Sequence, residues 1–290
     1  MRSASKLYKY MSTDGAIRLF NSLGIRFTQP DELNDPYECH LAFDRKARSK
    51  LIEDYFNFLV EQAPDEDREK LRDIALRNEQ TLLENALENY SRIRGELGVL
   101  SLSEDPLNLL MWAHYADEHR GVTIELDYSH ASLFKLAGGG AEFSSLNAVQ
   151  YQQNKVTGIP LPDTVVESLL VKSPDWEYEK EWRFIRTLNL LEEVKPGIFV
   201  EKLHPEAICK IILGTRFPGN RLEEIKKFTS KPEFQHVSIE KAMMIPNKFE
   251  LRAVSLEKFA GILFHRDHHF GDFAKESLLH VVMEEDDEMP

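Results

Sequence analysis

Apolar and polar residues alternate with a period of two in several short stretches of this chain, a pattern typical of half-buried β-strands. It predicts strands at residues 7–10, 25–28, 99–103, 122–126, 148–151, 179–185, 198–202, 208–213, 236–240 and 249–254. Apolar residues spaced three and four apart predict short helices at residues 13–23, 107–116, 130–136, 164–172 and 220–229. Because strands and helices do not alternate strictly, we expect an α+β fold with mixed or antiparallel sheets.

A longer helical pattern occupies residues 43–95, between the second and third predicted strands. Leu51 and Tyr55 lie on one apolar stretch, and Leu71 and Leu82 lie on another, with a break at Pro64. We therefore expect two or more helices inserted into the domain, where they serve as a lid or as the contact surface of a homodimer.

The domain organisation follows from these patterns. We expect one α+β domain at residues 1–256 that contains the helical insertion, followed by a C-terminal extension at 257–290 with an acidic tail. His265 and His269 in this extension are spaced as on one helix face, but no suitably placed carboxylates accompany them, so we expect no metal site.

Charge and cysteine content narrow the classes of partner. The chain has 36 basic and 49 acidic residues and a formal charge of -13, which opposes non-specific binding to nucleic acid or to an anionic membrane. Two cysteines are too few for a disulfide framework, and no apolar run is long enough to span a bilayer. We expect a soluble, cytoplasmic protein without membrane contact.

One candidate site lies at the start of the predicted helix that follows the third strand. Asp and Pro at 105–106 suit the beginning of a helix, and Asn108, Trp112 and Tyr115 then recur on one stripe, with His114 beside them. This stripe brings an amide, an indole and a phenol together. The alternative is an ordinary half-buried helix whose Trp and Tyr belong to the core.

A second candidate lies near residue 180. Read as a strand from Glu179, the sequence places Glu179, Glu181 and Arg183 on one face, so two carboxylates flank a guanidinium. A surface ladder of ion pairs would have the same pattern.

Two further polar elements precede these stretches. Lys9 is the cation of the first predicted strand, and Asn34, Asp35 and Pro36 form a rigid turn shortly before Glu38. We expect the turn to border the same cleft as Lys9. The alternative is a surface turn in which Asn34 and Asp35 bond to their own backbone.

These motifs occur in the order found in a bacterial family, domain of unknown function 2971, which the chain resembles over roughly residues 6–256. The motifs that carry the resemblance are Leu7–Tyr10, Arg26–Glu38, Ser101–Glu104, Leu110–Ala116 with Gly121, Trp176–Arg183 and Ile211–Gly214.

The layout also resembles, more distantly, the ADP-ribosyltransferase fold, which implies a use of NAD. By position, the resemblance implies three catalytic residues, Lys9, Tyr115 and Glu181, with Glu181 holding the ribose 2'-hydroxyl. Lys9 stands where those enzymes have His or Arg, and a lysine offers a point charge without their planar geometry. We expect the nucleotide to be bound by Arg183, Asn34, Asp35, Trp112 and His114.

Three functions remain open from the sequence. The first is an NAD-dependent ADP-ribosyltransferase-like enzyme acting in bacterial defence, including phage defence, or in stress, with an undetermined macromolecular target. The second is a metal-dependent nuclease whose Mg²⁺ ligands would be Asp35, Glu38, Glu179 and Glu181. The third is a non-catalytic sensor that binds a small nucleotide.

Overall fold

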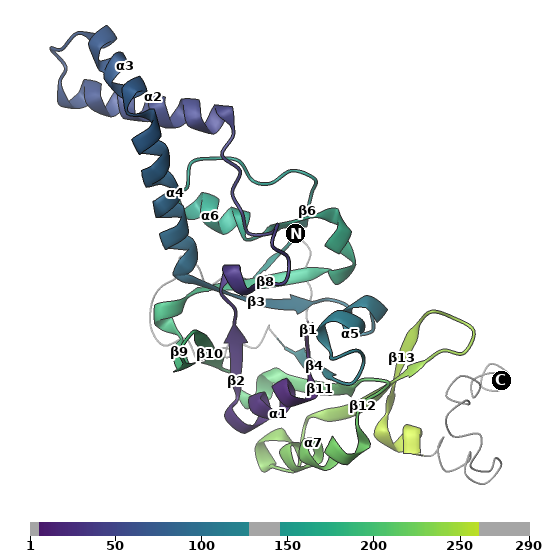
Figure 1. The fold of residues 1–290 in the computed structure, drawn as a ribbon. Coiled ribbons are helices and arrows are strands. Elements are labelled where there is room, and N and C mark those ends of the chain that lie inside the picture. Colours follow the sequence, from purple (N-terminus) through teal and green to yellow (C-terminus); the bar gives the residue numbers. More distant parts are fainter. Residues whose placement is uncertain (1–5, 128–145, 261–290) are drawn as a thin grey trace.

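A mixed eight-stranded sheet forms the centre of the protein in the computed structural model, which describes residues 6–127 and 146–260 (Figure 1). Its strands are β1 Leu7–Met11, β3 Leu97–Ser103, β4 Val122–Leu126, β5 Leu146–Ala148, β8 Glu181–Thr187, β11 Ile208–Leu213, β12 Ser238–Met244 and β13 Leu251–Ser255. They lie in the order β13-β12-β11-β4-β1-β3-β8-β5. Within this sheet β11 and β12 pair in parallel, and the other neighbouring pairs are antiparallel. The predicted α+β fold is therefore confirmed.

Smaller sheets and short helices surround the central sheet. The remaining strands are β2 Gly24–Phe27, β9 Glu192–Lys195 and β10 Ile198–Lys202 in one sheet, and β6 Gln150–Tyr151 and β7 Val171–Lys172 in another. The α-helices near the sheets are α1 Thr13–Ser22, α5 Leu109–Tyr115, α6 Pro162–Ser168 and α7 Leu222–Thr229. The 3-10 helices are η1 Pro30–Glu32, η2 Pro174–Glu179, η3 Leu188–Leu190, η4 Pro205–Ala207, η5 Gly219–Arg221 and η6 Pro232–Phe234.

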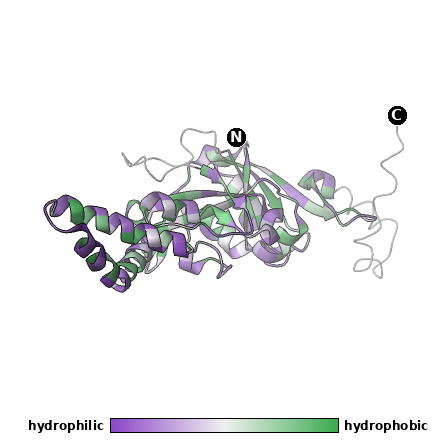
Figure 2. Ribbon diagram, turned by 90° about the horizontal axis from the view of Figure 1, so that it is seen from above, coloured by the Kyte–Doolittle hydropathy of each residue, from purple (hydrophilic) through white to green (hydrophobic). Residues whose placement is uncertain are grey.

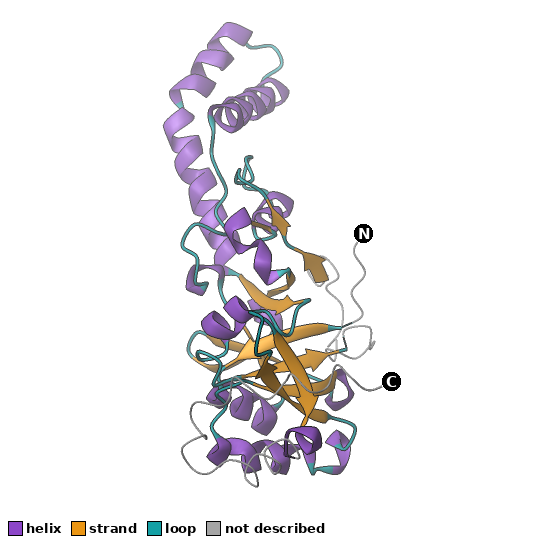
Figure 3. Ribbon diagram, turned by 90° about the vertical axis from the view of Figure 1, so that its right-hand side faces the viewer, coloured by secondary structure: helices purple, strands orange, loops and turns teal. Residues whose placement is uncertain are grey.

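The helical stretch predicted for residues 43–95 forms an arm that projects from the sheets (Figures 1 and 3). The arm consists of α2 Arg45–Gln62, α3 Arg68–Arg77 and α4 Glu79–Gly95. Its own core is small, with Phe56, Leu71 and Ala75 as the buried residues. The arm helices carry polar and apolar residues together, whereas apolar segments gather among the central strands (Figure 2).

The two faces of the central sheet differ in what covers them. One face packs against α1 and α7, whose Phe20 and Phe228 rings stack with centroids 4.1 Å apart. The other face carries two separate apolar clusters, one around Trp112 beneath α5 and one around Val99 beneath α4 and α6. Polar residues occupy the sheet between these two clusters, so the sheet itself provides a polar floor there.

Strand register explains how this polar floor is assembled. Ser103 lies opposite Tyr8 on one neighbouring strand and opposite Glu181 on the other, and Ser101 lies opposite Arg183. Because side chains on neighbouring strands at the same register point to the same face, these residues of β1, β3 and β8 share one side of the sheet.

Several predicted boundaries were wrong. The helix expected from Leu107 begins at Leu109, because Asn108 rather than Asp105 caps it by accepting hydrogen bonds from Leu110 and Met111. Leu110 on this helix is 48% exposed. The helix expected at 164–172 ends at Ser168 and is followed by β7.

The strand expected from Glu179 begins at Glu181. Glu179 ends η2, and Lys180 adopts a left-handed conformation with φ of 45° between the two elements. The expected helix at 130–136 and the C-terminal extension beyond residue 260 lie outside the described residues. Among the described helices, none is both long and apolar enough to cross a membrane.

Candidate active site

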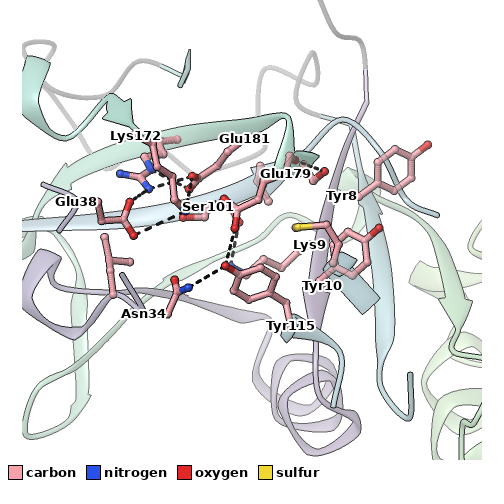
Figure 4. A pocket seen from close by; sticks show the side chains of 15 residues that line it. Tyr8, Lys9, Tyr10, Asn34, Glu38, Ser101, Tyr115, Lys172, Glu179 and Glu181 are labelled. Atoms are coloured by element: carbon pink, nitrogen blue, oxygen red, sulfur yellow. Dashed lines mark hydrogen bonds and ion pairs between the residues drawn. The ribbon is translucent and has the colours of Figure 1, made fainter. Parts of the chain in front are cut away.

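A pocket of about 430 Å³ opens above the polar floor of the sheet (Figure 4). Strands β1, β3 and β8, helix α5, η2 and the turn before Glu38 all contribute to its wall. Its polar lining residues are Tyr8, Lys9, Tyr10, Asn34, Glu38, Ser101, Ser103, Tyr115, Lys172, Glu179, Glu181 and Arg183.

Three buried glutamates surround the ammonium group of Lys172. Lys172 Nζ lies 2.6 Å from Glu179 Oε2, 3.5 Å from Glu181 Oε2 and 3.8 Å from Glu38 Oε1. All four side chains are at most 5% exposed. The left-handed turn at Lys180 directs Glu179 and Glu181 to the same side although they belong to different elements.

Arg183 holds the other side of this cluster. Its Nε and Nη2 donate to the two carboxylate oxygens of Glu181 at 2.8 and 2.9 Å, a bidentate arrangement, and Nη2 also donates to Glu38. Nη1 donates to the carbonyl of Leu169 at 2.7 Å. The guanidinium is fully buried and fully paired, so Arg183 fixes Glu181 and Glu38 in place.

The two neighbouring carboxyls Glu179 and Glu181 have opposite pKa shifts. Burial would raise the pKa of Glu181, but the charges of Arg183 and Lys172 outweigh burial and lower it to about 2. For Glu179 burial prevails, with a further contribution from the negative charge of Glu181, and its pKa is raised above the ordinary value. Glu181 is therefore a permanent anion at neutral pH, whereas Glu179 is the carboxyl that exchanges a proton more easily.

A chain of hydrogen bonds connects Glu179 to the pocket mouth. The Tyr115 hydroxyl donates to Glu179 Oε1 at 2.5 Å, and the Asn34 amide donates to the Tyr115 oxygen at 3.0 Å (Figure 4). Burial and the Glu179 charge raise the pKa of Tyr115, so the phenol keeps its proton. Tyr115 thus orients Glu179 from the solvent side.

Lys9 supplies the remaining cation of the pocket. Its Nζ donates to the carbonyl of Ser101 at 2.9 Å. Burial lowers its pKa to about 8, although Glu181 acts in the opposite direction. Among the described residues no carboxylate lies within 4 Å of Lys9 Nζ, so its charge remains available to an anionic ligand.

The structure brings together Lys9, Asn34, Tyr115, Glu181 and Arg183, five of the eight residues expected to act on or bind a nucleotide. The other three lie elsewhere. Trp112 is fully buried, and its indole N–H donates to the carbonyl of Pro106, so it belongs to the core. His114 is exposed and does not line the pocket. The carboxylate of Asp35 accepts a hydrogen bond from the Tyr37 backbone in its own turn.

Sequence reasoning missed the central role of Lys172. It was assigned to the end of a helix, and only the pairing of β6 with β7 shows that its side chain enters the cluster. Its ammonium lies between the three glutamates, where a nuclease would need its metal ion. Among residues 6–127 and 146–260, no group of three His, Cys, Asp or Glu side chains is arranged to hold a metal.

The site is therefore a buried, charge-paired pocket that contains a carboxyl of raised pKa, and comparison with known proteins adds a family match over part of the chain. A family model described as "Protein of unknown function (DUF2971)" matches residues 111–184, which supports that part of the resemblance. No curated protein and no solved structure matches the chain. The ADP-ribosyltransferase resemblance therefore has no support from these comparisons.

Proposed function

We propose that the pocket is an active site that breaks the N-glycosidic bond of a nucleotide, with NAD as the leading candidate substrate. The observation that carries this proposal is the opposite pKa shift of Glu179 and Glu181 at the base of one pocket. Two carboxyls with separated pKa values can divide the work of an electrostatic stabiliser and an acid or base.

The chemistry assigns a separate role to each carboxylate. When the bond between ribose C1' and the nicotinamide nitrogen breaks, its electron pair goes to the nitrogen and neutralises the pyridinium. The ribose then gains oxocarbenium character, which the permanent negative charge of Glu181 would stabilise. A water or acceptor hydroxyl forms the new bond to C1', and its proton passes to Glu179. A raised pKa makes Glu179 a stronger base for that step.

The other lining residues suit the remainder of such a substrate. Lys9 would hold a phosphate oxygen as a point charge, and Tyr115 would keep the Glu179 carboxylate oriented. Arg183 has no free donor direction for a phosphate, because each of its nitrogens donates to a protein partner. We therefore assign Arg183 to positioning Glu181.

The test is NAD consumption by the full chain, measured as released nicotinamide. We expect Glu179→Gln to lower kcat by roughly 100-fold or more, the scale of losing a general base. NAD at 100-fold above its Kd should still stabilise this variant by about 2.7 kcal/mol. Glu32→Gln is the matched control, since Glu32 is an exposed carboxylate that pairs with Arg26 and does not line the pocket.

Two results would count against catalysis. If NAD neither stabilises the protein nor is consumed, the proposal is wrong. If nucleotides bind but none is turned over, the non-catalytic nucleotide sensor becomes the better explanation. Both Glu179 oxygens already accept hydrogen bonds, from Tyr115 and Lys172, and this is the observation that favours the alternative.

A further inference from the structure

A second, larger pocket of about 590 Å³ lies on the other side of the charged cluster. The turn at residues 35–40, the segment 152–156 and residues around Lys172 form its wall. Glu38 and Lys172 line both pockets, so this ion pair is a shared partition between them. The family comparison assigns no role to this second pocket, and the chemistry proposed above does not use it.

Among the described residues, this partition contains a buried hydrogen-bond acceptor without a donor. Glu38 is 5% exposed, and its Oε2 accepts from Arg183. Its Oε1 lies 3.8 Å from Lys172 Nζ and accepts no hydrogen bond from the described residues. A buried carboxylate oxygen without a donor is costly, so a ligand hydroxyl or amine placed against Glu38 would satisfy it.

The mouth of the second pocket carries an aromatic ring and a cation. The Tyr37 side chain is 74% exposed, and Lys155 Nζ lies 5.7 Å from the centre of its ring. Gln153 and Asn154 add exposed amide groups next to Lys155. An exposed ring offers a stacking surface for a planar base, amides suit the edges of a base, and an ammonium suits a phosphate.

We propose that the second pocket binds a nucleoside phosphate, with the base on Tyr37, the phosphate near Lys155 and a ribose hydroxyl donating to Glu38. The three groups that such a ligand needs come from two segments of the chain, the turn at residues 35–40 and the segment 152–156, which meet at this pocket. Two sources have this chemistry: a free nucleotide, or the adenosine end of NAD held across the partition. Binding here does not require turnover in the first pocket.

The test measures Kd for AMP, adenosine and inorganic phosphate by titration calorimetry on the full chain. We expect AMP to bind more tightly than either fragment. Tyr37→Ala should weaken AMP binding about 10-fold, whereas Tyr37→Phe should leave it nearly unchanged, because the ring supplies the stacking. Lys155→Ala should weaken AMP binding and leave adenosine binding unchanged. Phe249→Ala is the control, since Phe249 is 97% exposed on the loop between β12 and β13.

Titration with NAD then distinguishes the two sources. If Tyr37→Ala weakens NAD and AMP binding equally, the second pocket holds the adenosine end of NAD. If only AMP binding weakens, the pocket holds a free nucleotide. Either result supports a nucleoside phosphate site, even if NAD is never consumed and the proposed catalysis is wrong. The inference is overturned if AMP does not bind, or if Tyr37→Ala and Lys155→Ala bind AMP like the unaltered protein.

Discussion

Replacing Glu181 by Gln tests whether the charged cluster stabilises the fold. The side chain is 5% exposed and meets Arg183 through two hydrogen bonds and Lys172 at 3.5 Å. Glutamine keeps the shape of the side chain but removes the negative charge that these two buried cations share. Arg183 retains its bond to Glu38, so the cluster loses one of its anions rather than all of them.

The size of the effect follows from the pKa of Glu181. Folding lowers this pKa from 4.5 to about 2. At about 1.4 kcal/mol for each pH unit, the ionised carboxylate contributes about 3 kcal/mol to the free energy of unfolding at neutral pH. Part of this loss is recovered in the variant, because the charge of Glu181 helps to raise the pKa of Glu179, and Glu179 ionises more readily without it. We therefore expect a net loss of about 2 kcal/mol, or roughly 4–8 °C in Tm.

The assay is thermal unfolding of Glu181→Gln and of the control Glu32→Gln between pH 2 and pH 7. Because folding lowers the pKa of Glu181, its contribution is complete above pH 4.5 and is lost as the pH falls toward 2. The Tm gap between the unaltered protein and Glu181→Gln should close over that range. Glu32→Gln should stay within about 0.5 kcal/mol of the unaltered protein, as exposed ion pairs do. A Glu181→Gln protein with an unchanged Tm at pH 7 would refute the reasoning.

Three further predictions concern the pocket and its supports. The profile of kcat/KM against pH should be bell-shaped. It should rise as Glu179 ionises, at a pH above the ordinary pKa of a glutamate, and fall above a pH of about 8 as Lys9 loses its proton. A flat profile would contradict both roles. Tyr115→Phe removes a hydrogen bond that lowers the pKa of Glu179, so the acid limb should move to higher pH, and an unmoved limb would exclude this coupling. Gly121→Ala should lower stability by about 3 kcal/mol, because the new methyl would approach the Met11 carbonyl to 2.1 Å; Gly95→Ala on α4 meets nothing within 4 Å and is the control in denaturant unfolding.

The sequence predicted much of the sheet because its side chains follow strict positional rules. The alternation of apolar and polar residues in β4 and the apolar residues of β11 specify strands whatever their neighbours are. The helical arm was equally predictable, since its apolar residues repeat over many turns. These patterns involve residues that are close together in the sequence, so they can be recognised without knowledge of the fold.

The site was less predictable because long-range pairing determines it. The sequence around Lys172 does not predict β7. This strand has only two residues, and it forms because it pairs with β6. The sequence also gives no indication that Lys180 adopts a left-handed conformation, since a lysine rarely has a positive φ. Of the residues predicted for the stripe on α5, Tyr115 lines the pocket, whereas Trp112 packs against Tyr10 in the core. The sequence pattern of this seven-residue helix did not distinguish these two outcomes.

The matched segment and the pocket overlap only in part. Residues 111–184 supply Tyr115, Lys172, Glu179, Glu181 and Arg183, in which two carboxylates balance two cations. Three further lining residues come from earlier in the chain. Glu38 also binds Arg183, Asn34 donates to Tyr115, and Lys9 has no carboxylate within 4 Å among the described residues. The matched segment therefore holds the proton-exchanging carboxyl and its fixed charges, whereas the N-terminal strand and turn complete the wall that a ligand would meet. For this reason the pocket depends on the register of β1, β3 and β8 across the whole sheet.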